Sequence, residues 1–222
     1  MNKEKGILVI ISGFSGAGKG TIVSGLMDNY PEELALSISA TTRAPRANEK
    51  EGVNYFYVTK ERFEEMIARD ELIEHAQFVD HFYGTPKAYV EEQMGNNKSV
   101  ILEIEMQGAL QIKQKLPQVC LIFVSTPNAE VLKKRLTERN TETQEVIAKR
   151  LAQANQDATY IPEYDYLVVN DDLNQAIADV YSIIRARCEG TEKTVQKFEV
   201  SKNQDFINKI TEELKGFLKG EN

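Results

Sequence analysis

The feature that most constrains this chain is a glycine-rich segment at residues 13–21, which follows five consecutive apolar residues and Ser12. The segment reads Gly-Phe-Ser-Gly-Ala-Gly-Lys-Gly-Thr, and the apolar residues 7–11 have the pattern of a strand buried on both faces. Apolar residues then recur at helical spacing from Ile22, and Pro31 marks the end of that helix. A strand, a glycine-rich turn and a helix in this order are typical of a phosphate-binding loop.

The residue types in this segment suit a nucleotide polyphosphate. Glycines let successive backbone N–H groups turn inward around phosphate oxygens, and Lys19 supplies a positive charge for the outer phosphates. The strict pattern has Ser or Thr directly after the lysine, whereas Gly20 stands there and Thr21 follows. We therefore expect either that the hydroxyl near a bound Mg²⁺ is that of Thr21 or that water replaces it. The predicted cofactor-binding residues are Gly13, Phe14, Ser15, Gly16, Ala17, Gly18, Lys19, Gly20 and Thr21. The alternative is an ordinary glycine-rich turn, and four glycines with a lysine argue against it.

Composition limits the remaining possibilities. The 222 residues are enough for one sizeable domain with insertions, and 41% hydrophobic residues are normal for a soluble globular chain. With 27 Lys and Arg against 34 Asp and Glu, the net charge of −7 argues against a general binder of nucleic acid or of anionic membranes. The two cysteines match no metal or redox spacing. The chain shows neither a signal-peptide pattern nor the roughly 20-residue apolar run of a membrane span, so we expect a cytoplasmic protein.

The rest of the chain alternates short apolar runs with helix-period stretches, which favours a parallel α/β sheet. We expect a core of residues 1–39 and 96–190, with a lid at about 135–155, a small α+β insert at 40–95 and a helical extension at 191–222 whose role the sequence leaves open. Further core strands are predicted at 100–105, 119–125 and 166–169, and helices near 108–115, 128–139, 143–160 and 173–188. In the insert, strands at 54–58, 72–78 and 82–85 surround one helix.

Five of the nine arginines fall in two short segments. Forked guanidinium groups suit the crowding of several phosphates better than ammonium groups do. The second segment spans a polar break between two predicted helices, which could close as a lid over the phosphates. The alternative is a solvated helix face with ion pairs along it. The five arginines are Arg43, Arg46, Arg135, Arg139 and Arg150.

Taken together, these residues resemble the guanylate kinases of bacterial type. The resemblance covers about residues 5 to 188, and no single motif except the arginine segment would carry it alone. The segments that carry it, in order, are Gly13 to Thr21, Ser39-Ala40-Thr41-Thr42-Arg43-Ala44-Pro45-Arg46, Gly52-Val53-Asn54-Tyr55, Ile73-Glu74-His75-Ala76, Tyr83-Gly84-Thr85, Leu102-Glu103-Ile104-Glu105-Met106-Gln107-Gly108, Arg135 with Arg139-Asn140-Thr141-Glu142-Thr143, and Val169-Asn170-Asp171-Asp172.

The resemblance implies a three-layer P-loop nucleoside triphosphate hydrolase fold and an ATP:GMP phosphotransferase that uses ATP and Mg²⁺. It implies that the GMP phosphate is held by Arg43, Arg46, Tyr55 and Tyr83. The guanine would be surrounded by Ser39, Glu74, Thr85 and Glu105. The lid contacts to phosphate would be Arg135, Arg139 and Arg150, and Asn170 would lie near the adenine.

Physical reasoning supports the guanine assignment separately. The pairing edge of guanine offers two donors beside one acceptor, so the Glu74 carboxylate can accept both donors while the Thr85 hydroxyl donates to O6. Adenine would present an acceptor to that carboxylate and leave buried polar groups unpaired. The alternative for Glu74 is an exposed strand residue, which is the usual place of a glutamate.

Glu103 and Glu105 are two residues apart, and we place both on one face at the carboxyl end of a strand. The resembling family often has aspartates here, so a direct metal role is open, and we take Thr21 and Glu103 as the Mg²⁺ candidates. Neither His75 nor His81 is expected to be catalytic, because an anionic phosphate oxygen needs no general base. Catalysis would rest on positioning and on charge neutralisation by Lys19, the arginines and Mg²⁺.

Three alternatives remain for the function. A P-loop kinase for another nucleoside monophosphate or a phosphorylated sugar is disfavoured by Glu74, Thr85 and Glu105. A non-catalytic guanylate-kinase-like binding module is disfavoured by the intact segment from Gly13 to Lys19. A nucleotide-hydrolysing switch lacks a residue to position the attacking water. The expected partners are small-molecule substrates, with a monomer or a homodimer equally open and no nucleic acid or membrane partner.

Overall fold

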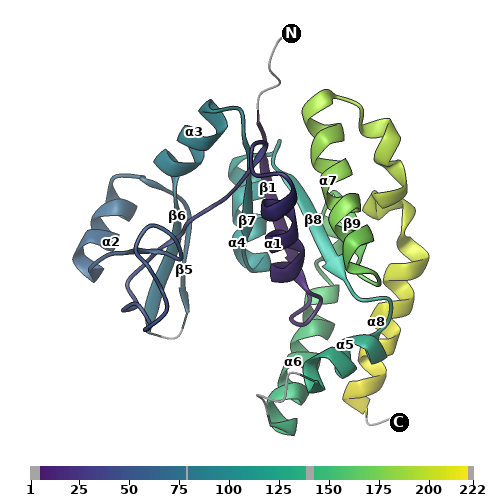
Figure 1. The fold of residues 1–222 in the computed structure, drawn as a ribbon. Coiled ribbons are helices and arrows are strands. Elements are labelled where there is room, and N and C mark those ends of the chain that lie inside the picture. Colours follow the sequence, from purple (N-terminus) through teal and green to yellow (C-terminus); the bar gives the residue numbers. More distant parts are fainter. Residues whose placement is uncertain (1–5, 79, 139–142, 220–222) are drawn as a thin grey trace.

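The computed structural model describes residues 6–78, 80–138 and 143–219, and a five-stranded sheet lies at its centre (Figure 1). All neighbouring strands in this sheet run parallel. The middle strand is buried along its whole length, which explains why its sequence is apolar from Leu8 to Ile11. In spatial order the strands are β2 (Leu34–Leu36), β7 (Ser99–Glu103), β1 (Leu8–Gly13), β8 (Cys120–Ser125) and β9 (Tyr166–Val169).

Helices cover both faces of this sheet and make three layers. On one face lie α1 (Lys19–Asn29) and α7 (Leu173–Glu189), which pack against each other, and α4 (Met106–Lys115) lies on the other (Figure 1). The buried residues of α7 follow the helical period that the sequence shows, from Ala176 to Ala186. The predicted α/β class with a parallel core sheet is confirmed.

A second, four-stranded sheet stands beside the core (Figure 1). Its order is β4 (Phe56–Tyr57), β3 (Ala40–Thr41), β6 (His81–Pro86) and β5 (Leu72–Phe78). Its own small apolar cluster consists of Ala40, Phe63, Met66 and Leu72 and includes two residues of α2 (Lys60–Ala68). The chain returns to the core through α3 (Lys87–Gly95).

The remaining helices gather at one end of the core. They are α5 (Ala129–Thr137), α6 (Gln144–Ala158) and α8 (Gln204–Lys219), and α8 packs along both of the others (Figure 1). Three short 3-10 helices complete the chain: η1 (Ile161–Glu163), η2 (Glu192–Phe198) and η3 (Val200–Lys202). No helix within residues 6–78, 80–138 and 143–219 combines the length and apolar character needed to cross a membrane.

Several elements differ from the sequence prediction. The strand predicted to reach residue 105 ends at Glu103, and α4 begins at Met106 rather than 108, so Glu105 is the residue before the helix and not part of the strand. The sequence also missed β2, which is three residues long, and α3, which buries only Val90 and so shows no apolar period. The strand predicted at 54–58 is shortened to Phe56–Tyr57.

Candidate active site

The carboxyl ends of the core strands form one edge, and the glycine-rich loop lies there. Register pairs Ile11 of β1 with Glu103 of β7 and places Gly13 beside Val124 of β8. β9 ends at Val169, next to Ser125. Open parallel sheets bind ligands at this edge, because strand ends and helix starts converge there.

The loop between β1 and α1 has the backbone that a phosphate-binding loop requires. Gly13 and Gly18 have φ of 144° and 90°. A Cβ at Gly13 would lie 2.0 Å from the Val124 carbonyl oxygen, and one at Gly18 would lie 2.5 Å from Nδ2 of Asn170. Only glycine fits at these two positions. Gly18, the N-cap residue of α1, provides no side-chain hydrogen bond to the first turn of the helix. The backbone N–H groups there are suited to binding a polyphosphate.

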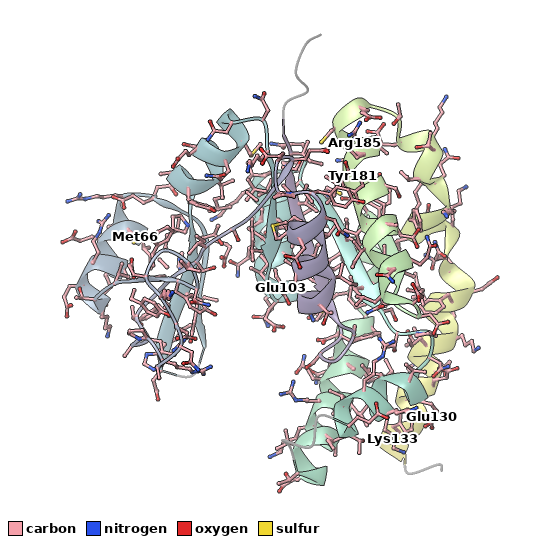
Figure 2. All side chains as sticks on the ribbon, viewed as in Figure 1. Met66, Glu103, Glu130, Lys133, Tyr181 and Arg185 are labelled. Atoms are coloured by element: carbon pink, nitrogen blue, oxygen red, sulfur yellow. The ribbon has the colours of Figure 1, made fainter. Side chains whose placement is uncertain are left out.

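The Lys19 side chain folds back across this loop. Its ammonium group donates to the carbonyl oxygens of Gly13 at 2.7 Å and Phe14 at 3.1 Å. Glu103 lies nearby, its carboxylate oxygens 3.7 Å from where a Cβ would stand on Gly20 (Figure 2). Removal of water raises the pKa of the Glu103 carboxyl, and Lys19 opposes that change. A lysine and a carboxylate therefore face the same side of the loop.

The side chain of Asn170 is hydrogen-bonded to the backbone of the loop. The side chain is 4% exposed, and its amide donates to the Ala17 carbonyl oxygen at 2.7 Å. Its backbone N–H donates to the carbonyl oxygen of Ser125 at 2.8 Å. The structure thus places Asn170 against the loop itself, and its predicted position near an adenine remains a prediction.

Two of the arginines predicted for a lid, Arg135 and Arg150, lie on helices that touch the loop. Arg150 on α6 donates a hydrogen bond to the Ser15 hydroxyl. Leu136 on α5 would contact a Cβ at Gly16, so α5 packs directly on the loop, and Arg135 is the preceding residue on that helix. Arg139 lies outside the residues that the structure describes.

The arginine segment of the insert forms a second cluster of hydrogen-bond donors. Arg43 pairs with Glu49 at 2.9 Å, and both side chains are only 15–16% exposed. The same carboxylate accepts from the Arg46 backbone N–H at 2.8 Å and from the Tyr57 hydroxyl at 3.0 Å. The Arg43 hydrogen bond, followed by the one from Arg46, lowers the pKa of Glu49 to about 2. This part of the insert therefore binds an anionic group, which here is the protein's own carboxylate.

Other residues of the insert and its border are predicted to bind substrate: Arg46, Tyr55 and Tyr83 for the phosphate, and Ser39 for the guanine. The Arg43 guanidinium lies over the Tyr55 ring at 5.4 Å, and the rings of Tyr55 and Tyr83 are 6.0 Å apart. Arg46 has an exposed side chain. Ser39 lies just before β3, where its carbonyl accepts from Phe56. Of the predicted phosphate contacts, Arg43, Tyr55 and Tyr83 are thus brought together.

Glu74 and Thr85 form a buried polar pair on β5 and β6. Glu74 is 6% exposed and Thr85 is fully buried, and the Thr85 hydroxyl donates to Oε1 of Glu74 at 2.8 Å. The second oxygen of Glu74 lies 3.5 Å from where a Cβ would stand on Gly108, in the first turn of α4. Burial raises the pKa of the carboxyl, and Thr85 moderates the rise. A buried carboxylate of the insert therefore faces the core.

Sequence reasoning missed two acidic residues of the site. One is Glu49, described above. The other is Asp157 on α6, 6% exposed, which accepts from the Gln153 amide at 2.8 Å. Burial raises the pKa of Asp157 to about 6, with Glu105 adding to the rise and Lys19 opposing it. A signal was available, since Asp157 follows Arg150 by seven residues and so lies on the same helix face.

The two residues predicted as Mg²⁺ ligands, Thr21 and Glu103, have less geometric support than the other site residues. Glu103 lies beside the loop, and Thr21 is exposed in the first turn of α1. Within the part of the chain that the structure describes, no three His, Cys, Asp or Glu side chains are grouped as a metal site would need.

Comparison with known proteins agrees with this geometry. The family model described as guanylate kinase matches residues 5–187. A guanylate kinase from Caldanaerobacter subterraneus is 43% identical over 211 residues, covering 95% of this chain and 98% of its own. One from Clostridioides difficile is 44% identical over 212 residues, with the same shares covered.

A solved structure is similar as well. The crystal structure of guanylate kinase from Anaplasma phagocytophilum superposes with a TM-score of 0.64 at 31% sequence identity. The superposition covers 84% of this chain and 88% of that one. The sequence relatives and the similar solved structure thus belong to the same family.

Proposed function

The chain belongs to the guanylate kinase family and phosphorylates GMP with ATP as the donor, and we propose that the transfer takes place between the loop at residues 13–21 and the insert. The observation that carries this proposal is the buried Glu74, which the insert presents to the core at the start of α4. For the proposal we divide the chain into a core of 1–39 and 96–190 with a lid at about 135–155, a GMP-binding insert at 40–95 and an extension at 191–222.

The donor site would be the loop. Backbone N–H groups from Gly13 to Thr21 would surround the β- and γ-phosphates, and Lys19 would exchange its two carbonyl partners for phosphate oxygens. Asn170 would hold the loop rigid through Ala17 and lie close to the adenine end of the nucleotide. Fixed donors are worth more than mobile ones, because they need not reorganise during the reaction.

The acceptor site would be the insert. We propose that Arg43, held in place by Glu49, binds the GMP phosphate, with Arg46, Tyr55 and Tyr83 around it. Glu74 would accept the two N–H donors of guanine, and Thr85 would turn its hydroxyl proton from Glu74 to O6. Ser39 and Glu105 would complete the surroundings of the base.

The reaction would need no general base. An anionic oxygen of GMP attacks the γ-phosphorus of ATP, the bond from that phosphorus to the bridging oxygen breaks, and ADP leaves. Lys19, Arg43, Arg135, Arg139 and Arg150 would neutralise the charge on the transferred group. Mg²⁺, which would also neutralise this charge, would be held by the phosphates with Thr21 and Glu103, directly or through water.

The test is ADP release from MgATP with GMP, AMP, UMP, CMP or dTMP, beside a reaction without acceptor. Turnover with GMP alone is the expected result. Turnover with another acceptor would contradict the proposed guanine site. Absence of turnover with every acceptor would favour a non-catalytic binding module. Chelation of Mg²⁺ should abolish turnover, and Glu103→Gln should raise the Mg²⁺ concentration needed to restore it.

Two variants test the two halves of the site. Lys19→Met should nearly abolish turnover. An unchanged rate would contradict the proposal that residues 13–21 bind the ATP phosphates. Glu74→Ala should raise the KM for GMP far more than the KM for ATP, because the base loses its acceptor. Glu64→Gln is the matched control, since this carboxylate is 58% exposed on α2 of the same insert.

We infer a cytoplasmic enzyme of purine nucleotide metabolism that acts on free GMP and ATP. A net charge of −7 does not favour nucleic acid or an anionic membrane as partner. A monomer and a homodimer both fit the inference.

A further inference from the structure

The last helix of the chain is an amphipathic element that the family match does not include. The matched region ends at residue 187, whereas α8 spans Gln204–Lys219. One face of α8 is apolar, and its residues Ile207, Ile210 and Leu214 are buried at 5% exposure or less. The helix runs beside α5 and α6 and closes the core at that end (Figure 1).

A polar contact joins α8 to the start of α5. Oε2 of Glu213 accepts from the Ala129 backbone N–H at 2.9 Å, and Ala129 is the first residue of α5. The neighbouring cap residue Asn128 uses its own side chain for Val131, so Glu213 satisfies a donor that the cap does not reach. A carboxylate at a helix N-terminus is also favoured by the helix dipole.

A second contact joins α8 to α5 one helical turn further along both helices. The Lys133 side chain on α5 is labelled in Figure 2, and its ammonium group lies over the Phe217 ring, 4.7 Å from the ring centre. Glu213 and Phe217 are one helical turn apart on α8, as Ala129 and Lys133 are on α5. The two helices are therefore joined in a defined register.

The helices that α8 holds are those that touch the phosphate-binding loop. Two residues after Lys133 on α5 comes Arg135, and Leu136 packs at Gly16 of the loop. α6, which packs along α8, carries Arg150 to the Ser15 hydroxyl. Displacement of α8 would thus move two arginines relative to the loop.

We propose that α8 is a positioning element for the donor half of the reaction, with Glu213 as its positioning residue. α8 fixes the positions of α5 and α6 relative to the loop. In this way it also fixes the positions of Arg135 and Arg150, which these helices carry. The proposal rests on the proposed roles of these arginines at the ATP phosphates. Glu213 touches no reacting atom and acts only through α5.

The experiment compares KM for ATP, KM for GMP and kcat in three variants. Glu213→Ala should raise the KM for ATP by about three- to tenfold, the size expected when one hydrogen bond is lost, and leave the KM for GMP unchanged. Glu213→Gln should restore most of the wild-type value, because its amide oxygen can still accept from Ala129. Glu212→Ala is the control, since Glu212 is 72% exposed and pairs with Lys215.

Thermal unfolding measured on the same samples separates positioning from simple stabilisation. If Glu213→Ala lowers only the Tm, and KM for ATP well below that temperature is unchanged, the proposal is overturned. Equal rises in both KM values would also overturn it. Arg150→Ala shows where a failure lies: if it too leaves the KM for ATP unchanged, the proposed role of the arginine has failed, and otherwise only the role of α8 has.

Discussion

At the scale of single residues, two carboxylates of the candidate site have pKa values shifted in opposite directions. Glu49 joins Arg43, the Arg46 backbone and Tyr57, and Asp157 lies on the same face of α6 as Arg150. The pKa of Glu49 is lowered, so this carboxyl stays charged down to low pH. The pKa of Asp157 is raised, so this carboxyl is protonated more easily. Their effects on activity and stability should differ accordingly.

Glu49→Ala should weaken the use of GMP. The carboxylate holds the Arg43 guanidinium and the backbone at Arg46 in one arrangement, and without it both become free to move. We expect kcat/KM for GMP to fall by about tenfold, as for the loss of a charge-assisted hydrogen bond, with little change in KM for ATP. Steady-state kinetics check this, and Glu64→Gln should behave as wild type. A gain in GMP affinity would instead mean that Glu49 competes with the phosphate.

Asp157→Asn should stabilise the protein at high pH but not at low pH. The folded-state pKa is about 6, above the ordinary 3.8, so the folded protein binds more protons between these values and its stability falls as pH rises through them. The asparagine removes this loss, which we put on the order of 1–2 kcal/mol at pH 8 and near zero below pH 4.

Urea unfolding at pH 4 and pH 8 measures this difference. The exposed Asp28 on α1 offers a control, and Asp28→Asn should show the same change in unfolding free energy at both pH values. If Asp157→Asn were equally stabilising at both, its effect would come from hydrogen bonding with Gln153 rather than from proton binding.

At the scale of elements, what the sequence could predict depended on local periodicity. The strand before the glycine-rich loop was readable because every residue from Leu8 to Gly13 is buried. β2 and α3 were not, because a three-residue strand and a helix with one buried side chain leave no period. A sequence pattern therefore finds a strand that is buried throughout or a helix with a long buried face, and it misses elements with few buried residues.

The same contrast applies within the site. Residues 13–21 are contiguous, so their glycines and lysine form a local pattern. The contact between Glu74 and Thr85 exists because β5 and β6 pair antiparallel, with His75 opposite Gly84. Nothing near Glu49 in the sequence distinguishes it from other charged residues of a polar loop, and only the fold shows its three donors.

Gly18→Ala tests the loop as an element. The position has φ of 90°, and the added Cβ would lie 2.5 Å from the Asn170 amide that supports the loop. Strain of this kind costs about 1–3 kcal/mol, and relief by movement of Asn170 would displace Ala17. We expect ATP affinity to fall more than tenfold by titration calorimetry.

A glycine-to-alanine change elsewhere provides the matched control. Gly216 lies inside α8 with nothing within 4 Å of an added Cβ. Gly216→Ala should leave ATP affinity unchanged and raise stability by about 0.5–1 kcal/mol, because alanine favours the helix. Wild-type ATP affinity in Gly18→Ala would show that the loop tolerates a different backbone.

At the scale of the whole molecule, the chain has two apolar cores of very different size. One runs through the parallel sheet and its helices as far as Leu214 on α8, and the other is the insert cluster of Ala40, Phe63, Met66 and Leu72. The glycine-rich loop at residues 13–21 lies on the large core, and Arg43 and Glu74 lie on the insert. ATP and GMP sites should therefore respond separately to loss of packing.

Phe63→Ala and Phe123→Ala are matched changes for this test, because both rings are fully buried but in different cores. Each should cost about 3–5 kcal/mol of local stability. Phe63→Ala should abolish most GMP use while calorimetric ATP affinity stays within about twofold, since the loss is confined to the insert. Phe123 packs edge-on against Phe14 of the loop at 5.0 Å, so its removal should weaken ATP binding directly. Equal loss of ATP affinity in both variants would mean that the insert and the core unfold as one cooperative unit.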